Sequence, residues 1–548
     1  MIVLALLALL GCAPLQSSPV RAPAASPRSA RSAPRPAKAP TAYAVLVNGG
    51  AEPLRNYSSH LQHLQETRAA LLLRGFAPEA IAIFDADGGD PAPDQLAMPA
   101  DDGVQWLLVG TEYEELLAPT PRDSEWDVAR QPATRDALKR WLGDTRFREG
   151  DSLLFYVTDH GSRDALSLWH EELSPAELAK LLDQVPATTH TVLVMSQCFA
   201  GSFQGALTPE SNRCALYAVP GDRRAYGCFP SDGSARDGHA FAVADALPSA
   251  ASWSALRDVV SLTDEAPDVP LMSSDVYLAQ VMADADLDAL LAAAGVMDLR
   301  AAMPQLAAFH ALGRRFGLPA VRTSRELRDD AAAEEVRAKA AESVLGEWFS
   351  VLGAANALNA SRAAQPSDRD RAAVQAALRA QAERDGSWPL VQALVEQVRA
   401  SVDTRMAHAR RSAVRERQLI ELRRVAAGGL SEPQQARLGQ LTACEGAAIG
   451  EAPSAPPPEL PPAPARRAHD ASPPNAFGLA VDGDVVVSVE AGSMAATAGL
   501  RVGDKLLQVD ATTDPAWYTF ALALHPTRVR FARRGVARGV ALEWPEAP

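Results

Sequence analysis

Short apolar runs alternate with amphipathic segments between residues 43 and 247. This alternation is typical of helices that cross over a mostly parallel sheet whose strands are buried on both faces. The predicted strands are residues 43–48, 80–84, 152–158, 191–196 and 214–219. We therefore predict an α/β fold for this region.

The segments between these strands carry helix signals. Residues 57–74 read as a helix that ends at Gly75, a residue type that commonly closes helices. Ser174 and Glu177 form a capping box, with Pro175 at the first helical position. We expect a helix at each place.

The chain after residue 275 changes character twice. Residues 276–450 are rich in Ala, Arg and Glu and contain no strand pattern, so an all-α region is expected, with Val344, Leu345, Trp348 and Phe349 packed inward. Residues 451–474 are rich in proline and are predicted to form an extended linker. A further small domain is then expected at 475–548.

The first residues have the features of a signal sequence for secretion. Residues 2–10 are apolar and too short to span a bilayer, which needs about 20 residues, so they are typical of a secretory signal. The sequence Leu9-Leu10-Gly11-Cys12 resembles a bacterial lipoprotein signal, which implies that Cys12 is lipidated after removal of residues 1–11. An ordinary cleaved signal, or a true start codon further upstream that the gene assignment missed, is the alternative, since no Lys or Arg precedes the apolar run.

The resemblance to lipoproteins implies a place in the cell. Ala13 follows Cys12 where an inner-membrane retention signal usually has Asp, which favours the outer membrane, facing the periplasm. Two or three lipid chains would hold the protein stably at a membrane. Residues 13–42 are rich in proline and arginine and are predicted to be a tether.

Charge and cysteine content exclude two classes of protein. The chain has 548 residues, enough for several domains, and 53 Lys and Arg oppose 67 Asp and Glu, a net charge of -14. This sign is wrong for a binder of phosphate backbones, so no nucleic-acid partner is expected. Cysteines are too few for a disulfide-built scaffold, although an oxidising periplasm would permit a bridge between Cys214 and Cys228.

Two residues with catalytic chemistry follow predicted strands. His160 comes after strand 152–158, and Cys198 comes after strand 191–196. Ligands gather at the carboxyl ends of parallel strands, where a thiol can attack a carbonyl carbon and an imidazole can transfer the proton. A buried structural cysteine and a structural histidine are the alternatives, but their shared position at one sheet edge favours a catalytic dyad.

The same residues carry a family resemblance. Asn56-Tyr57 after the first strand, Asp159-His160-Gly161, and Gln197-Cys198 follow the order of legumain-like cysteine peptidases of the caspase and hemoglobinase clan, and Tyr226-Gly227-Cys228 resembles a later family segment. The resemblance implies that Cys198 is the nucleophile, His160 the acid and base, and Asn56 the residue that orients the imidazole. It also implies an oxyanion hole formed by the N–H groups of Gly161 and Cys198. Asn56 could instead cap the helix that follows.

The substrate-binding residues depart from the legumain pattern. Ser58 and Ser196 stand where legumains place the Arg and Glu that help to form the asparagine pocket. The loop after the next strand, where this clan builds the rest of the pocket, contains Asp222, Arg223, Arg224 and Asp232. A charged or amide side chain is therefore the expected preference, and a solvated surface loop is the alternative.

No metal or cofactor is expected. Residues 85–90 contain three aspartates but lack the glycine position and closing Glu of a calcium loop, so a turn is predicted. His60 and His63 lie three residues apart on a predicted helix and have no evident third partner, which favours a structural role.

The carboxyl-terminal segment resembles a bacterial PDZ domain. The specific part is Ala498-Gly499-Leu500 followed by Gly503-Asp504. Such domains bind an extended or C-terminal peptide along a sheet edge, and the resemblance implies that Phe477, Gly478 and Leu479 hold its carboxylate. A degenerate groove that serves only as a spacer is the alternative.

These observations predict a membrane-anchored cysteine endopeptidase whose PDZ-like domain binds peptides or partners. The alternatives are a transpeptidase that uses the same acyl-enzyme and a noncatalytic lipoprotein scaffold. Because legumains carry a helical prodomain over the active site, we also hypothesise that the all-α region restrains the enzyme.

Overall fold

The computed structural model describes residues 40–98, 103–207, 212–228, 236–363, 370–450, 479–482, 485–489, 494–509, 527–533 and 536–542. Cys12, the signal, the tether up to residue 39 and the proline-rich linker lie outside the described residues. Among the described helices, none combines the length and apolar composition needed to cross a membrane.

A six-stranded sheet is the centre of the first part of the chain, in the order β10-β9-β8-β5-β1-β2. Five strands are parallel, and the short β10 pairs antiparallel with β9. The bounds are β1 Ala42–Asn48, β2 Ile81–Asp85, β5 Ser152–Val157, β8 His190–Met195, β9 Arg213–Tyr217 and β10 Leu271–Met272. The predicted α/β class and all five predicted strands are confirmed, with ends shifted by one or two residues.

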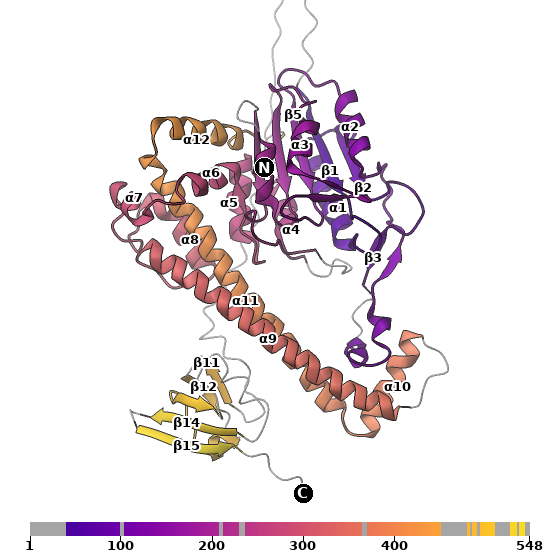
Figure 1. Cartoon of the computed structure of the whole chain (residues 1–548), viewed down its shortest axis with the longest axis vertical. Coiled ribbons are helices and arrows are strands. Elements are labelled where there is room, and N and C mark those ends of the chain that lie inside the picture. Colours follow the sequence, from indigo (N-terminus) through magenta and orange to yellow (C-terminus); the bar gives the residue numbers. More distant parts are fainter. Residues whose placement is uncertain are drawn as a thin grey trace, which may run out of the picture. The chain divides into compact units, whose positions relative to one another are not determined.

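Helices cover both faces of this sheet (Figure 1). Alternate strand residues point to opposite faces of the sheet. Phe155 and Val157 therefore pack on the face covered by α2 and α3, whereas Leu154 and Tyr156 pack on the face covered by α1, α4 and α5. The bounds are α1 Ser58–Leu73, α2 Arg135–Asp144, α3 Pro175–Leu182, α4 His239–Ala246 and α5 Trp253–Thr263. The predicted capping box is present, since Ser174 Oγ accepts from Glu177 N at 3.3 Å.

Two small ribbons and short helical turns lie in the connections. β3 pairs antiparallel with β4, and β6 with β7. Their bounds, with those of the turns used below, are β3 Gln95–Ala97, β4 Thr120–Arg122, β6 Leu166–Leu168, β7 Glu171–Leu173, η2 Gln105–Leu108 and η4 Ala200–Ala206. The residues after β2 form a turn, as predicted from the sequence.

The all-α region is confirmed, and part of it belongs to the sheet's own core. α9 and α11 run side by side (Figure 1). Ala413 and Ile420 of α11 pack in the core with α2 and α3, while Cys444 of α12 and Ile449 pack on the opposite face. The bounds are α6 Ser273–Val281, α7 Leu287–Ala293, α8 Ala307–Arg315, α9 Ser324–Arg362, α10 Arg371–Arg384, α11 Trp388–Ala426 and α12 Glu432–Glu445.

A disulfide joins this region to the sheet, and it is not the bridge suggested from the sequence. Cys214 of β9 pairs with Cys444 of α12, 230 residues away. Cys228 is a free thiol whose Sγ donates to Asp159 O at 3.7 Å. The two thiols suggested as partners lie in different places, because Cys214 is inside a core strand and Cys228 follows that strand in a loop.

The carboxyl-terminal part is a separate antiparallel sheet in the order β11-β12-β13-β14-β15. The predicted PDZ-specific segment stabilises it: Leu500 is buried in its core, and Asp504 Oδ1 accepts from Arg533 Nε at 2.6 Å. The bounds are β11 Leu479–Asp482, β12 Val485–Val489, α13 Met494–Thr497, β13 Lys505–Val509, β14 Thr527–Arg533 and β15 Val536–Leu542.

Candidate active site

The two candidate catalytic residues lie at one edge of the sheet. β5 and β8 are neighbouring parallel strands in which Val157 is aligned with Met195. His160 and Cys198 each follow that aligned pair by three residues. The chain therefore delivers both side chains beyond the carboxyl ends of adjacent strands, where the sequence predicted them.

The segments that carry the two residues are in contact. A Cβ atom added at Gly161 would lie 2.6 Å from the carbonyl oxygen of Cys198 and 2.6 Å from Cγ of Gln197. Such contacts are too short for any side chain, so only glycine allows this approach. The backbone of Gly161 therefore lies against the segment Gln197-Cys198.

A backbone carbonyl orients the imidazole of His160. The Nε2 atom of His160 lies 2.8 Å from the carbonyl oxygen of Arg55. Because a carbonyl oxygen can only accept, Nε2 carries the proton and Nδ1 keeps its lone pair. The ring also packs edge-on against Tyr57 and His60, with centroids 4.8 Å and 5.1 Å away. The imidazole is thus held in the tautomer that leaves one nitrogen free to act as a base.

Burial keeps both members of the dyad neutral. It lowers the pKa of His160, and the charge of Arg55 lowers that pKa further, while the hydrogen bond to the Arg55 carbonyl opposes the shift. Burial likewise raises the pKa of Cys198, with Asp268 raising and Arg224 lowering it by their charges. A neutral thiol needs a base to become a nucleophile, and a neutral imidazole is a group that can act as a base.

Asp159 anchors the loop that carries His160. Its carboxylate accepts from Gly50 N at 2.6 Å and from His160 N at 2.5 Å, which ties the end of β5 to the end of β1. Burial raises the pKa of Asp159 to about 7, and these two N–H donors oppose the rise. Asp159 is therefore a structural support for the imidazole.

Two backbone donors at this edge have no acceptor in another residue. Within the described part of the chain, the N–H groups of Gly161 and Cys198 donate to no other residue, although the N–H of Cys198 interacts with its own thiol. The following N–H groups are satisfied, since Ser162 N donates to Ala165 O at 2.7 Å and Phe199 N to Arg223 O at 2.7 Å. Available donors beside a nucleophile are what an oxyanion hole requires.

Asn56 does not have the role predicted for it. Its Oδ1 accepts from Asn48 Nδ2 at 2.9 Å, and its Nδ2 donates to Asp94 O at 2.8 Å. The residue is fully buried, and both halves of its amide are occupied away from the imidazole. The alternative is also wrong, because α1 begins after Tyr57 with no side-chain cap. The preceding residue, Arg55, orients His160 through its backbone instead.

The two serines predicted to contact substrate are buried. Ser58 is 8% exposed and starts α1. Ser196 is 4% exposed, and its Oγ pairs with His239 Nδ1 at 2.9 Å. Neither presents a side chain to the solvent, so neither offers the pocket surface that the family positions suggested.

The loop of residues 220–228, called here the Arg223 loop, lies against Cys198. The thiol of Cys198 donates to Ala225 O at 3.7 Å. Arg223 forms an ion pair with Glu416 of α11, whereas Asp222 and Arg224 are exposed. Arg224 acts on Cys198 by its charge and has no ion-pair partner among the described residues. Asp232 lies outside the described residues, as do Phe477 and Gly478, while Leu479 is buried in the core of the carboxyl-terminal sheet.

His60 lies close to Asp159 and His160, two possible metal ligands that are distant from it in the sequence. His60 and His63 both lie on α1, and His60, Asp159 and His160 place ligand-type atoms within 4.8 Å of one another. Zinc bonds of about 2.0–2.1 Å need ligand atoms closer together than that upper limit. The oxygens of Asp159 also accept backbone N–H groups. His190 forms a similar group with Cys214 and Cys444, whose sulfurs are bonded to each other.

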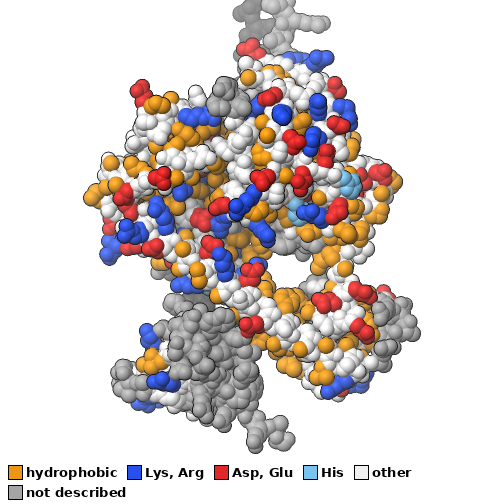
Figure 2. Space-filling model, viewed as in Figure 1, with side chains coloured by type: hydrophobic (Ala, Val, Ile, Leu, Met, Phe, Trp, Pro, Cys, Tyr) orange, Lys and Arg blue, Asp and Glu red, His pale blue; other side chains and the backbone are white. Residues whose placement is uncertain are grey.

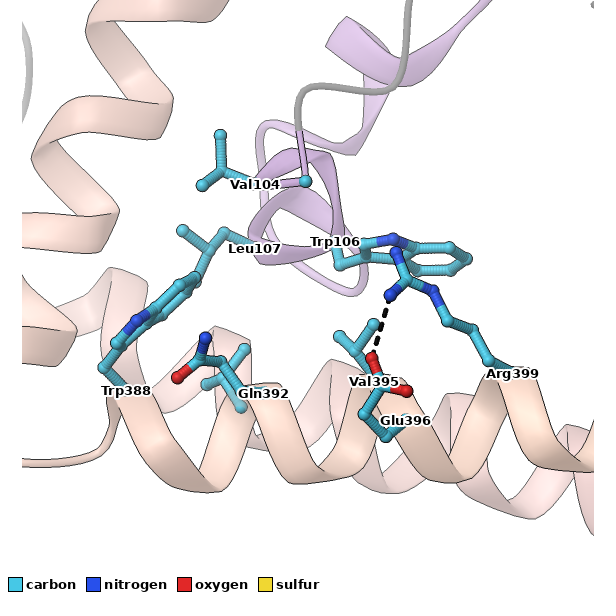
Figure 3. Close-up of a pocket in the computed structure, with 10 residues that line it drawn as sticks. Val104, Trp106, Leu107, Trp388, Gln392, Val395, Glu396 and Arg399 are labelled. Carbon is cyan, nitrogen blue, oxygen red and sulfur yellow. Dashed lines mark hydrogen bonds and ion pairs between the residues drawn. The ribbon is translucent and has the colours of Figure 1, made fainter. Parts of the chain in front are cut away.

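A separate groove lies between η2 and α11 (Figure 3). Trp106 and Trp388 line it, and Arg399 stands over the Trp106 ring at 5.9 Å. No cysteine or histidine lines this groove. Its lining combines apolar side chains with the polar groups of Gln392, Glu396 and Arg399, and it contains neither His160 nor Cys198.

Sequence reasoning missed the Arg55 carbonyl and the Glu416 contact with the Arg223 loop. Any residue type can supply a backbone carbonyl, so the residue type of Arg55 does not reveal this acceptor. The ion pair of Glu416 with Arg223 joins residues about 190 positions apart in the sequence. Only the order Asn56-Tyr57 pointed to the correct segment.

Two family models match parts of the chain. Residues 144–290 match the model of the Peptidase C13 family, the legumain family, and residues 485–513 match that of the PDZ domain. The first match contains His160, Gly161 and Cys198. No curated protein matches the chain. The chain thus combines a legumain-like peptidase domain with a C-terminal PDZ domain.

Proposed function

We propose that the protein is a cysteine endopeptidase in which Cys198 attacks a peptide carbonyl and His160 transfers the proton. The observation that carries the proposal is the bond from His160 Nε2 to Arg55 O, which leaves Nδ1 free at the edge of the sheet where Cys198 lies. The N–H groups of Gly161 and Cys198, which donate to no other described residue, fit the same chemistry.

The mechanism follows from the neutral dyad. As the thiol proton moves to Nδ1 of His160, the sulfur forms a bond to the carbonyl carbon and the carbonyl oxygen becomes negative. The N–H groups of Gly161 and Cys198 stabilise that charge, each donor being worth about 3 kcal/mol. The C–N bond then breaks, and the imidazolium gives its proton to the leaving amine. His160 next removes a proton from water, which hydrolyses the thioester and restores the thiol.

Arg224 is the candidate that remains for recognition of the substrate side chain. It is exposed, close enough to Cys198 to lower the thiol pKa by its charge, and not committed to a carboxylate, whereas Arg223 is. A guanidinium pairs well with a carboxylate. We therefore infer a preference for an acidic residue before the cleaved bond, which digestion of a peptide library would show.

Two other functions use the same fold. A transpeptidase would pass the same acyl group to an amine instead of water, and product analysis with an added amine separates the two. A noncatalytic scaffold would need a blocked or absent dyad, but Cys198 is a free and partly exposed thiol. That exposure favours the enzyme.

The proposed setting is the bacterial cell envelope. Its support is the sequence ending at Cys12, which resembles a lipoprotein signal, and the order of a tether before the peptidase domain. We also propose that the PDZ domain binds peptides or partners at a sheet edge, which its match to the PDZ model supports. Detergent partitioning of Cys12→Ser and peptide-array binding by the full chain test these two proposals.

The test of the peptidase is labelling with a peptide probe that carries a thiol-reactive group after aspartate. We expect the parent to be labelled at Cys198, Cys198→Ala to lose labelling, and His160→Gln to react 10²–10⁴-fold more slowly because the base is missing. Peptide hydrolysis should follow the same order.

Cys228→Ala is the matched control, because Cys228 is the other free thiol in the described part of the chain. It should retain labelling and hydrolysis. Equal labelling of the parent and Cys198→Ala would contradict the proposed function.

A further inference from the structure

The residue after the nucleophile has a strained backbone. Phe199 adopts φ 57 and ψ 25, the left-handed region, which costs a residue with a side chain about 1–2 kcal/mol. Its N–H donates to Arg223 O at 2.7 Å. The conformation of Phe199 sets the direction in which the preceding Cys198 projects, so the bond to Arg223 helps to hold the nucleophile in place.

The Arg223 loop touches the nucleophile segment at two points. Arg223 O accepts from Phe199 N, and Ala225 O accepts from the thiol of Cys198 at 3.7 Å. Val219, the residue before the loop, is also tied to η4, because Gly201 N donates to Val219 O at 3.0 Å. The geometry at Cys198 therefore depends on where this loop is held.

Helix α11 holds the loop at both sides of Ala225. On one side, Glu416 forms an ion pair with Arg223, and the two side chains are only 30% and 22% exposed. Burial raises the pKa of Glu416, and the charge of Arg223 opposes the rise. The contact is partly shielded from water, which makes it stronger than an exposed surface pair.

On the other side, the neighbouring Arg417 acts through Asp268. Arg417 Nε donates to Asp268 O at 2.9 Å. Asp268 Oδ1 in turn accepts from Tyr226 N at 2.8 Å, directly after Ala225. Two consecutive residues of one helix thus hold the loop two residues before and one residue after Ala225, whose carbonyl accepts from the thiol.

We propose that Glu416 is a positioning residue for the nucleophile, acting through Arg223 and Phe199 to hold Cys198 in its reactive orientation. This inference rests on the proposed peptidase function. It makes the long helical pair of α9 and α11 part of the active-site framework, so a displacement of α11 lowers turnover. This is the reverse of the restraint hypothesised from the sequence.

The experiment compares Glu416→Ala, Glu416→Gln and the charge exchange Glu416→Arg with Arg223→Glu. The substrate is a fluorogenic peptide chosen from cleavage products of the parent. We expect Glu416→Ala to lower kcat about tenfold with KM within about twofold, because an orientation important at the transition state is lost. The charge exchange should recover part of the loss, which a merely structural helix residue would not do.

A second readout does not depend on activity. Hydrogen exchange of the Phe199 amide reports its bond to Arg223, and we expect protection to fall about tenfold in Glu416→Ala. Glu335→Ala is the matched control, since Glu335 of α9 also faces the charge of Arg223 but pairs with Lys339 at 2.9 Å. It should change neither readout.

The outcomes separate the two claims. If the parent protein shows no hydrolysis, or hydrolysis that persists in Cys198→Ala, the proposed peptidase function is wrong. Hydrogen exchange of the Phe199 amide would still test whether Glu416 positions the segment that contains Cys198. Unchanged kcat and unchanged Phe199 protection in Glu416→Ala would overturn the positioning role. If Glu416→Ala fails to fold, Glu416→Gln and the charge exchange give the same comparison.

Discussion

The two halves of helix α11 are attached to the protein by different kinds of interaction. In the first half, the buried residues that pack with η2, α9 and α10 are aliphatic, among them Val391, Leu394 and Val398. In the second half, Arg417 and Glu421 are buried and bound to polar groups of the peptidase domain. Figure 2 shows apolar side chains over the η2, α9 and α10 end and charges of both signs near the sheet.

The difference shows where exact placement is required. Apolar burial is non-directional and tolerates small shifts, whereas a buried guanidinium surrounded by carbonyls has one arrangement in which all its donors are satisfied. The directional half is the half that contacts the Arg223 loop next to Cys198. The apolar half lines the groove of Figure 3 and carries no contact to the dyad.

Arg417→Met, in the second half of α11, should have the largest effect on stability and activity. Arg417 is fully buried and donates to the carbonyls of Ser261, Asp264, Ala266 and Asp268 at 2.8–3.0 Å. Its removal leaves those acceptors and nearby carboxylates unpaired, so the free energy of unfolding should fall by about 3–5 kcal/mol and hydrolysis should be lost. Urea denaturation measures the change.

Arg399→Met, in the apolar half of the same helix, is the control for Arg417→Met. Arg399 is about half exposed, with 46% of its side chain accessible, so the loss should stay below about 1 kcal/mol. Equal losses for the two variants would show that the halves do not differ as argued.

Val398→Ala tests the apolar half. Val398 is fully buried, and removing two methyl groups should lower the free energy of unfolding by about 2 kcal/mol. Because the residue touches no part of the site, kcat should stay within about twofold of the parent. Val336→Ala, at a 66% exposed position of α9, should change the free energy by less than about 0.5 kcal/mol. A large fall in kcat for Val398→Ala would extend the functional part of α11 to its first half.

Glu334→Gln tests a polar contact between α9 and α11. Its effect on the free energy of unfolding should be the smallest of the three. Glu334 Oε2 lies 2.6 Å from His408 Nδ1, and although burial opposes it, this bond and the charges of His408 and Arg337 lower the pKa of Glu334. A lowered carboxyl pKa contributes stability that is present above the unfolded value of about 4.3 and is lost as the pH falls through the folded value. We expect a loss of about 1 kcal/mol near pH 6 that disappears in acid.

Unfolding curves at several pH values measure this effect. Glu396→Gln is the control, because Glu396 pairs with Arg399 on the surface of α11 with 67% of its side chain exposed. It should cost a few tenths of a kcal/mol at most. A Glu334→Gln loss that does not depend on pH would contradict the assignment to its ionised form.

The strands, and the position of His160 and Cys198 at one sheet edge, were predictable from the sequence because their signals are local. An apolar run followed by His160 or Cys198 needs no knowledge of distant residues, and parallel pairing then places both at one edge. The sequence pattern found the correct segment because it matches residue types, here Asn56 followed by Tyr57. It could not identify the group that orients His160, because that group is the backbone carbonyl of the preceding residue, Arg55.

The long-range contacts could not be predicted in this way. Nothing in the residues near Cys444 indicates that it meets Cys214, and nothing near Glu416 indicates that it meets Arg223. Both contacts result from how the helical region packs on the sheet. Side chains that serve the site from outside their own segment become visible only when the fold is known.

The bond between Cys214 and Cys444, whose sequence separation is 230, closes the chain between them into a covalent ring. A peptidase that cuts itself, or is cut by another, anywhere inside that ring would yield two pieces that stay one molecule until a reductant is added. Maturation of this protein would then be invisible on a gel run without reductant, and a processed form would keep α12 fastened to its sheet.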